Sequence, residues 1–202
     1  MTREEFDREF LDSGVTCLAG VDEAGRGPLA GPVYAAAVVL PKGFYMEEIN
    51  DSKALTEKKR EALFPLIQEA AVSYCIASVD EKTIDEINIL NATMLAMKKA
   101  IEGLSVTPDL ILVDGNISRG LPQPNKCVKK GDALSQTIAA ASILAKVARD
   151  RYCKEVLAVE YPEYEFDKHK GYGSAKHCEL IRKLGPCPAH RRSFLTKILA
   201  KD

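Results

Sequence analysis

Short apolar runs and helical periodicities alternate along this chain. Apolar residues run from Val15 to Val21 and again from Val33 to Leu40, with the glycine-rich segment Gly25–Pro28 between them. So short a connection between two apolar runs predicts an antiparallel pair of strands. Further strands are predicted for residues 74–79, 109–113 and 126–130.

Apolar residues at spacings of three and four predict helices between these strands. Thr56 is placed to cap a helix that ends near Ala71. Further helices are predicted for residues 84–104, 134–159 and 174–184. Strands that first pair and then alternate with helices indicate an α/β domain with a mixed sheet. We find no linker that divides the chain, so residues 1–202 are expected to form a single domain.

The composition is that of an ordinary globular protein. Of 202 residues, 46% are hydrophobic and 28% are charged, which excludes a disordered tail, a fibre and a small disulfide scaffold. No apolar stretch is long enough for a membrane span, and the N-terminus lacks the layout of a secretory signal. We therefore expect a cytoplasmic protein without a membrane partner. The six cysteines are scattered with no C-x-x-C pair and are expected to be reduced thiols, mostly buried.

Charge is distributed unevenly although the net charge is only -1. From Asp167 to Asp202 there are nine basic residues and three acidic ones. This basic end on an acidic body is consistent with a polyanionic partner bound at one face. Charge asymmetry is also common on solvated helices, so it carries no function by itself.

Carboxylates follow three of the predicted strands. They are Asp22-Glu23, Asp114 and Asp132, and functional groups tend to collect at strand ends. Four carboxylates in one cleft repel one another and must take up protons or bind cations. Oxygen ligands select Mg²⁺ or Mn²⁺, and two such ions about 3.5–4 Å apart promote phosphodiester hydrolysis. The alternative is a set of ordinary capping or turn residues.

A glycine-rich loop follows the first acidic pair. Gly25 and Gly27 allow the backbone to approach a ligand closely, and successive N–H groups can bind an anion. A nucleoside-triphosphate loop is excluded because Arg26 and Gly27 stand where its Lys and Ser/Thr are required. A tight hairpin is the simpler alternative.

The sequence around these acids resembles a known family. Asp22-Glu23-Ala24-Gly25-Arg26-Gly27-Pro28, followed by Gly31-Pro32-Val33, is similar to the opening signature of bacterial type 2 ribonuclease H (ribonuclease HII). Similar blocks follow in family order, at residues 50–53, 113–116, 130–132, 138–150, 169–173 and 190–194. The resemblance covers nearly the whole chain, and the glycine loop favours type 2 over type 3.

This resemblance implies a ribonuclease H-like α/β fold, a mixed central sheet flanked by helices, with a basic helical C-terminal part over about residues 163–202. It implies an endonuclease that degrades the RNA strand of RNA–DNA hybrids and cuts 5′ of a ribonucleotide in duplex DNA. The products carry 3′-hydroxyl and 5′-phosphate ends. The implied catalytic and metal-binding residues, holding two Mn²⁺ or Mg²⁺ ions during catalysis, are Asp22, Glu23, Asp114 and Asp132.

The family also implies residues that bind the substrate. The backbone of Gly25, Arg26 and Gly27 would read the 2′-hydroxyl, with Tyr172 against the same sugar. Tyr172 is otherwise a surface aromatic in a turn. Candidates for duplex phosphates are Lys53, Lys170 and Arg191-Arg192, although lone lysines are usually solvated. His169, His177 and His190 are expected to serve packing or phosphate contacts rather than metal binding.

Two other functions use the same features. A junction resolvase would apply these carboxylates to DNA and be indifferent to the 2′-hydroxyl. A non-catalytic nucleic-acid-binding module would keep the acids only as caps. We favour the ribonuclease, acting as a monomer on RNA–DNA hybrid and on ribonucleotide-containing duplex DNA.

Overall fold

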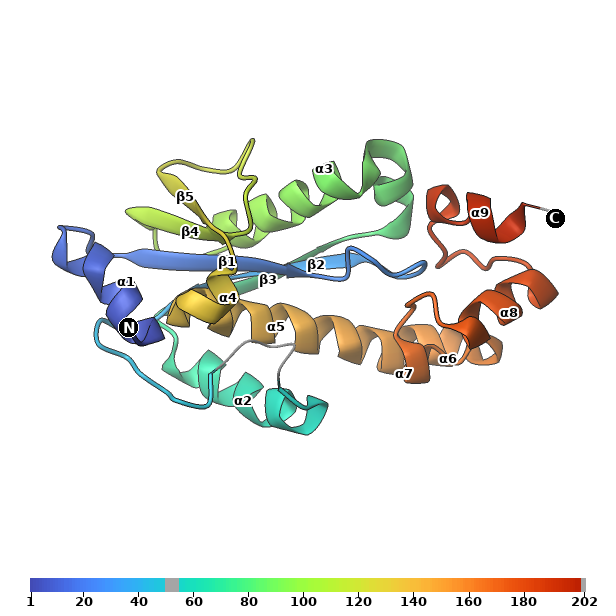
Figure 1. The fold of residues 1–202 in the computed structure, drawn as a ribbon, viewed down its shortest axis with the longest axis horizontal. Coiled ribbons are helices and arrows are strands. Elements are labelled where there is room, and N and C mark those ends of the chain that lie inside the picture. Colours follow the sequence, from blue (N-terminus) through green and yellow to red (C-terminus); the bar gives the residue numbers. More distant parts are fainter. Residues whose placement is uncertain (50–54, 201–202) are drawn as a thin grey trace.

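A mixed sheet of five strands forms the centre of the fold, as a computed structural model of the chain shows for residues 1–49 and 55–200 (Figure 1). The strand order is β3-β2-β1-β4-β5. β2 lies antiparallel to both β1 and β3, whereas β4 is parallel to both β1 and β5. The predicted hairpin is therefore confirmed. The strands are β1 (Leu18–Ala24), β2 (Val33–Val39), β3 (Ser73–Val79), β4 (Leu110–Asp114) and β5 (Asn125–Val128).

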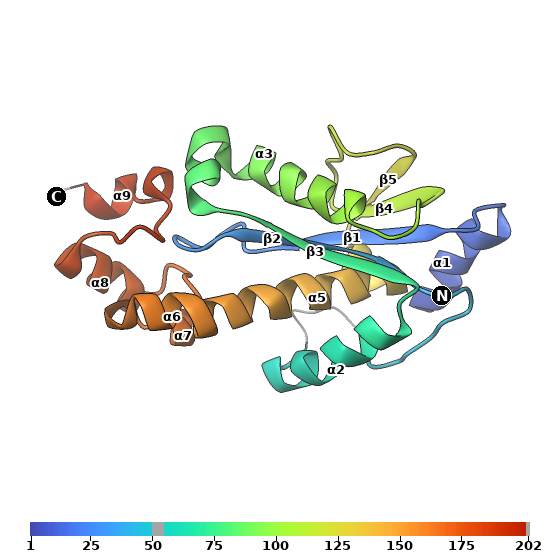
Figure 2. The same ribbon diagram turned by 180° about the vertical axis from the view of Figure 1, so that it is seen from behind.

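Helices cover both faces of this sheet. α3 packs on one face, and α5 lies with α2 on the other (Figures 1 and 2). From about residue 162 onward the chain forms the helical C-terminal part that the sequence predicts. The helices are α1 (Arg3–Asp12), α2 (Glu57–Ala70), α3 (Glu81–Glu102), α4 (Gly131–Leu134), α5 (Gln136–Tyr152), α6 (Ala158–Glu160), α7 (Phe166–His169), α8 (Ala175–Leu184) and α9 (Thr196–Leu199). A π-helical segment (Cys153–Leu157) and two 3₁₀ turns (Pro162–Tyr164, Arg192–Phe194) complete them.

Alternate residues of β1 face the two helical layers, as the pleat of a strand requires. Ala19 and Val21 belong to the apolar cluster beneath α3. Gly20 faces α5, where an added Cβ would lie only 2.4 Å from the carbonyl carbon of Thr137. The fully buried alanines 139–141 continue this close contact. The small residues of α5 therefore let the helix lie directly against the strand that carries the acidic pair.

The strand boundaries place the acidic pair differently from the prediction. β1 does not end at Val21 but continues through Asp22 and Glu23, because Ala24 is still paired with Tyr34 of β2. The two carboxylates are thus held by the sheet itself. Asp114 likewise forms the last residue of β4.

Two helices also differ from their predicted bounds, and a third was not predicted. The predicted helix 134–159 is interrupted at Ser135, whose extended backbone ends α4 and whose hydroxyl caps α5. α3 begins at Glu81 rather than 84, because Asp80 accepts a hydrogen bond from the Thr83 N–H. The sequence analysis missed α1, which starts with a capping box between Thr2 and Glu5.

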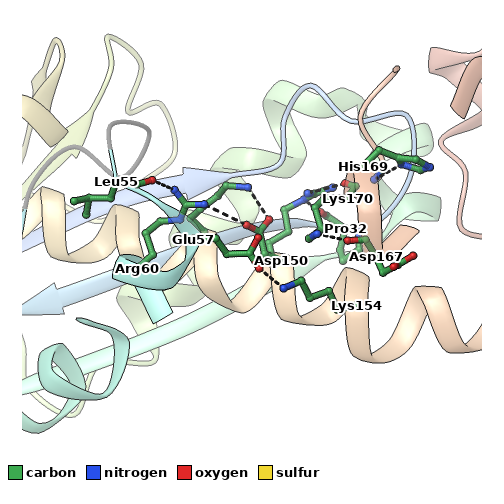
Figure 3. Close-up of polar contacts among 12 residues, drawn as sticks. Pro32, Leu55, Glu57, Arg60, Asp150, Lys154, Asp167, His169 and Lys170 are labelled. Atoms are coloured by element: carbon green, nitrogen blue, oxygen red, sulfur yellow. Dashed lines mark hydrogen bonds and ion pairs between the residues drawn. The ribbon is translucent and has the colours of Figure 1, made fainter. Parts of the chain in front are cut away.

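Ion pairs connect α2 to α5 and the π-helical segment (Figure 3). Glu57 pairs with Lys154, and Glu61 binds the guanidinium of Arg151. Arg60 is buried, lies 3.8 Å from Asp150 and donates to the Leu55 carbonyl. The exposed pairs contribute little to stability, whereas removing one partner of the buried pair would leave an uncompensated charge.

The C-terminal part has a small core that contains two histidines. His177 and His190 are 0% and 2% exposed and pack around Phe166. Burial lowers the pKa of both rings to about 4. The expectation that these histidines serve packing is confirmed for this pair.

All six cysteines are free thiols. Two of them, Cys153 and Cys187, are buried, and the other four are half-buried, so the prediction of mostly buried thiols is correct only in part. Among the helices of residues 1–49 and 55–200, none combines the length and apolar character needed to cross a bilayer.

The close contact between β1 and α5 predicts that a methyl group added at Gly20 destabilises the fold. Gly20→Ala should lower the free energy of unfolding by about 1–3 kcal/mol, because the backbone of α5 must move away. Urea denaturation measures this. Ser78→Thr, which adds a methyl group at an exposed position of β3, is the control and should change little. Equal midpoints for Gly20→Ala and wild type would contradict the close packing.

The buried histidines predict a loss of stability in acid. Their pKa is about 4 in the folded chain and 6.5 ordinarily. Between these values the unfolded chain binds more protons, so the free energy of unfolding falls as the pH drops from 6.5 to 4. Asp22 and Glu23 have raised pKa values, so they make the free energy of unfolding rise as the pH drops. The contribution of the histidines is therefore isolated by comparing a histidine variant with wild type.

Urea midpoints across this pH range should fall less in His190→Gln than in wild type, because one titrating ring is removed. The exposed control Lys183→Gln should keep the wild-type dependence. A His190→Gln variant with an unchanged pH dependence would show that the ring does not titrate as described.

Candidate active site

Three of the four predicted carboxylates line one pocket at the end of β1 and β4. In the parallel pairing of these strands Val21 lies opposite Val113, so Asp22 and Asp114 follow at the same end of the sheet. Glu23 extends from the next position of β1. The pocket measures about 210 Å³, and its other lining residues are Ala24, Gly25, Arg26, Ser142, Lys146 and Tyr172.

Burial and the neighbouring carboxylates make Asp22 and Glu23 hard to ionise. The pKa of Asp22 is well above its usual range because the side chain is buried and because Glu23 and Asp114 lie nearby. Burial also raises the pKa of Glu23, although Arg26, at 3.5 Å, opposes the shift. Such a group of anions favours an added positive charge.

Asp132 occupies a separate position, on α4. It is 5% exposed and, among the described residues, does not line the pocket with the other three. Its neighbour Gly131 donates its N–H to Asp114 Oδ1 at 2.6 Å. The start of α4 is thereby tied to the end of β4, which keeps Asp132 close to the carboxylate group.

The chemistry of the donors fits a hard divalent cation. They are all carboxylate oxygens, which Mg²⁺ and Mn²⁺ prefer. Burial and the neighbouring carboxylates raise the pKa of Asp22 and Glu23, and a bound cation would relieve both effects. Within the described residues, no three His, Cys, Asp or Glu side chains already stand at metal-binding distances. Arg26, the Glu23 N–H and the Gly131 N–H engage the carboxylates instead.

The glycine-rich loop is shaped by a buried arginine from the C-terminal part. Arg191 is 0% exposed and donates to the carbonyl oxygens of Gly25 and Arg26 at 2.6 and 3.0 Å. It also bonds the carbonyls of Pro28 and Gly31. In a trans peptide the N–H points opposite to the carbonyl. The N–H groups of Arg26 and Gly27 are therefore turned away from Arg191.

A second buried arginine joins this loop to the turn that carries Tyr172. Arg149 of α5 donates to the carbonyls of Ala30, Pro32 and Lys170. It passes so close to Gly25, whose φ is +95°, that a Cβ there would lie 2.0 Å from Arg149 Nε. The Tyr172 ring is 43% exposed and lies near Gly27, where an added Cβ would be 3.9 Å from Tyr172 Cε1.

The sequence analysis missed three polar residues of α5. Ser142, Lys146 and Arg149 recur at spacings of four and three on the helix face beneath the pocket. Ser142 donates a hydrogen bond to Asp22, and Lys146 Nζ lies 5.7 Å from the Tyr172 ring while paired with Asp150. The sequence did contain a signal for them, because polar residues at helical spacing within an alanine-rich tract indicate a polar face of a buried helix.

The predicted phosphate contacts have different outcomes. Arg191 cannot reach a phosphate because it is buried against backbone carbonyls, so that prediction was wrong. Arg192 is exposed and Lys170 is half-buried. Lys53 lies outside the described residues.

Comparisons with known proteins find similar sequences and similar folds. A family model described as ribonuclease HII matches residues 19–197. The ribonuclease HII of Caldicellulosiruptor saccharolyticus is 54% identical over 195 residues, covering 96% of this chain and 95% of that protein. The crystal structure of ribonuclease H2 from Pyrococcus horikoshii has a TM-score of 0.69 at 28% identity, covering 90% of this chain and 96% of that one.

A more distant structure shares the fold alone. Bst-RNase HIII, solved in complex with Mn²⁺, has a TM-score of 0.61 at 19% identity, covering 84% of this chain and 63% of that one. The predicted fold class, a ribonuclease H-like mixed sheet flanked by helices with a helical C-terminal part, is confirmed. With its family match, its close relatives and its fold in agreement, this chain belongs to the ribonuclease HII family and is a nuclease.

Proposed function

We propose that this chain is a metal-dependent endonuclease that hydrolyses the RNA strand of RNA–DNA hybrids and cuts 5′ of ribonucleotides embedded in duplex DNA. It leaves 3′-hydroxyl and 5′-phosphate ends. One observation carries the proposal: a single pocket combines Asp22, Glu23 and Asp114 with the glycine-rich loop and Tyr172. Carboxylates suited to metal-dependent phosphodiester hydrolysis thus lie beside a loop and a tyrosine suited to binding a ribose.

The four carboxylates, Asp22, Glu23, Asp114 and Asp132, would hold Mn²⁺ or Mg²⁺, with two ions during catalysis. When bound, such ions supply Lewis-acid stabilisation of the charge that develops on the attacking and leaving oxygens. The raised pKa values of Asp22 and Glu23 support this assignment because burial, together with the neighbouring carboxylates, disfavours their negative charge until a cation is bound. The Mn²⁺ complex of the related ribonuclease HIII supports a divalent ion of this kind.

The glycine-rich loop supplies the recognition of RNA. Because Arg191 holds the carbonyls of Gly25 and Arg26, the N–H groups that follow them face away from it and can donate to a 2′-hydroxyl. Tyr172 offers a flat ring and a hydroxyl to the same ribose. A deoxyribose lacks the oxygen that these donors require, so the loop selects the nucleotide at the cut.

Further basic residues would hold the rest of the duplex. Lys53, Lys170 and Arg192 are the candidates for phosphate contacts, which position a duplex without reading its sequence. The exposed basic residues of α8, including Lys176, Arg182 and Lys183, are further candidates for such contacts.

We further propose that residues 1–202 act as one catalytic domain and as a monomer. α5 supports the single domain because Ser142 and Lys146 face the sheet's pocket while Arg149 of the same helix binds the turn of the C-terminal part. The six free thiols suit a reducing compartment such as the cytoplasm.

The decisive experiment uses end-labelled duplex DNA that contains one ribonucleotide. With Mg²⁺ or Mn²⁺ the wild type should make a single cut 5′ of the ribonucleotide, and with chelator it should make none. An all-DNA duplex should remain intact. Cleavage of the all-DNA duplex would favour a resolvase-like activity, and binding without any cut would favour a non-catalytic module.

The variant Asp22→Asn should lose about a thousandfold or more in kcat/KM on this substrate, because several kcal/mol of charge stabilisation disappear. Its free energy of unfolding should not fall, since a neutral amide avoids the burial of a charge and the repulsion that together raise the Asp22 pKa. Asp12→Asn, at an exposed surface residue, is the control and should stay active. An active Asp22→Asn variant would remove this residue from the proposed site.

A further inference from the structure

We propose that His177 and His190 are positioning residues that set the place of Tyr172 above the pocket. They form a buried chain of hydrogen bonds that starts at the Cys187 backbone and ends on the Tyr172 carbonyl. The inference rests on the proposed role of Tyr172 in substrate binding.

The chain connects four groups through hydrogen bonds. The backbone N and the Sγ of Cys187 lie 3.0 and 3.1 Å from His190 Nδ1. His190 Nε2 lies 3.1 Å from His177 Nε2. His177 Nδ1 then lies 2.9 Å from the Tyr172 carbonyl oxygen. Each ring nitrogen of the two histidines therefore has a specific polar neighbour.

The partners at the two ends determine the direction of every hydrogen bond. A carbonyl only accepts, so His177 must donate from Nδ1, and its Nε2 must accept. His190 must then donate from Nε2 and accept at Nδ1, where the Cys187 N–H supplies the proton. One tautomer of each neutral ring satisfies the whole chain. A proton added to either ring would set two N–H groups against each other.

The surroundings keep both rings neutral. Both are buried, and no carboxylate is among the groups that shift their pKa values. His169 stacks on His177 with ring centroids 4.1 Å apart, and Arg192 lies near His190, so the neighbouring charges disfavour protonation. The chain is thus intact across the neutral pH range.

A second set of hydrogen bonds holds the backbone of Gly171, which precedes Tyr172. Gly171 donates its N–H to His169 Nδ1, and its carbonyl accepts from the Leu29 N–H. His169 in turn donates from Nε2 to the Tyr164 carbonyl. The backbone on both sides of Tyr172 is therefore fixed to the C-terminal core and to the glycine-rich loop, while the ring itself remains 43% exposed. The fixed backbone therefore determines the position of the Tyr172 ring that would contact the substrate.

Two substitutions at His177 distinguish loss of the hydrogen bond to the Tyr172 carbonyl from a general loss of packing. In His177→Asn the amide nitrogen takes the place of Nδ1 and can still donate to the Tyr172 carbonyl. In His177→Gln the amide lies near the position of Nε2, so that the donor to Tyr172 is lost. For the single-ribonucleotide duplex we expect kcat/KM to fall about tenfold in His177→Gln and about threefold at most in His177→Asn.

A double-mutant cycle tests whether the effect passes through the tyrosine ring. Tyr172→Ala removes the ring, so adding His177→Gln to it should cost about twofold at most. A merely structural role would instead give the same tenfold loss in both backgrounds.

A measurement that does not depend on activity completes the design. The chain has no tryptophan, so Tyr172→Trp introduces a unique fluorophore at the ring position. Its anisotropy should fall when His177→Gln is added and should stay unchanged with His177→Asn.

The outcomes distinguish the two proposals. Failure of the wild type to cut the ribonucleotide duplex, with the anisotropy pattern as expected, would overturn the proposed function and leave the positioning chain supported. A wild type that cuts, with equal losses in both backgrounds or unchanged anisotropy in His177→Gln, would overturn the positioning role. Equal damage by His177→Asn and His177→Gln would overturn it as well.

Discussion

The burial of the Arg191 guanidinium is the constraint on which the site depends. A buried charge is costly unless its hydrogen-bonding groups are satisfied, and here four carbonyls of residues 25–31 satisfy it. Burial and the nearby Arg149 lower the pKa of Arg191 to about 9, so the group remains a cation at neutral pH. The loop must keep its shape because any other conformation would leave that charge without partners.

Two opposite charge distributions lie on either side of the glycine-rich loop. The carboxylates of β1 and β4 face the pocket, and the guanidiniums of Arg149 and Arg191 lie behind the loop. Glu81, whose Oε1 is buried without a hydrogen-bond partner in the described structure, balances part of this positive charge. Peptide dipoles between the two layers are thereby oriented with their carbonyls toward the cations. The backbone donors are left on the side where a substrate would bind.

The C-terminal part acts on the site through backbone groups rather than through its surface charge. Arg191 holds the glycine-rich loop, and the histidine chain holds the turn of Tyr172. The sequence analysis assigned Arg191 and Arg192 together to duplex phosphates. Burial is a property of the assembled fold, so no local pattern distinguishes Arg191 from the exposed Arg192.

The chain's own pattern determined the strands, most helices and the identity of the chemical groups. Apolar runs and periodicity are local, and the acidic and glycine motifs are contiguous, so each could be identified without coordinates. Tertiary structure alone decided where β1 ends, because pairing with β2 carries it through Glu23 to Ala24. It also decided that Ser142 and Lys146 reach the pocket, and that Asp132, unlike the other three carboxylates, does not line it. These outcomes depend on contacts between residues far apart in sequence. The free energy of such a contact is set by both partners, so it cannot be judged from the sequence of one segment.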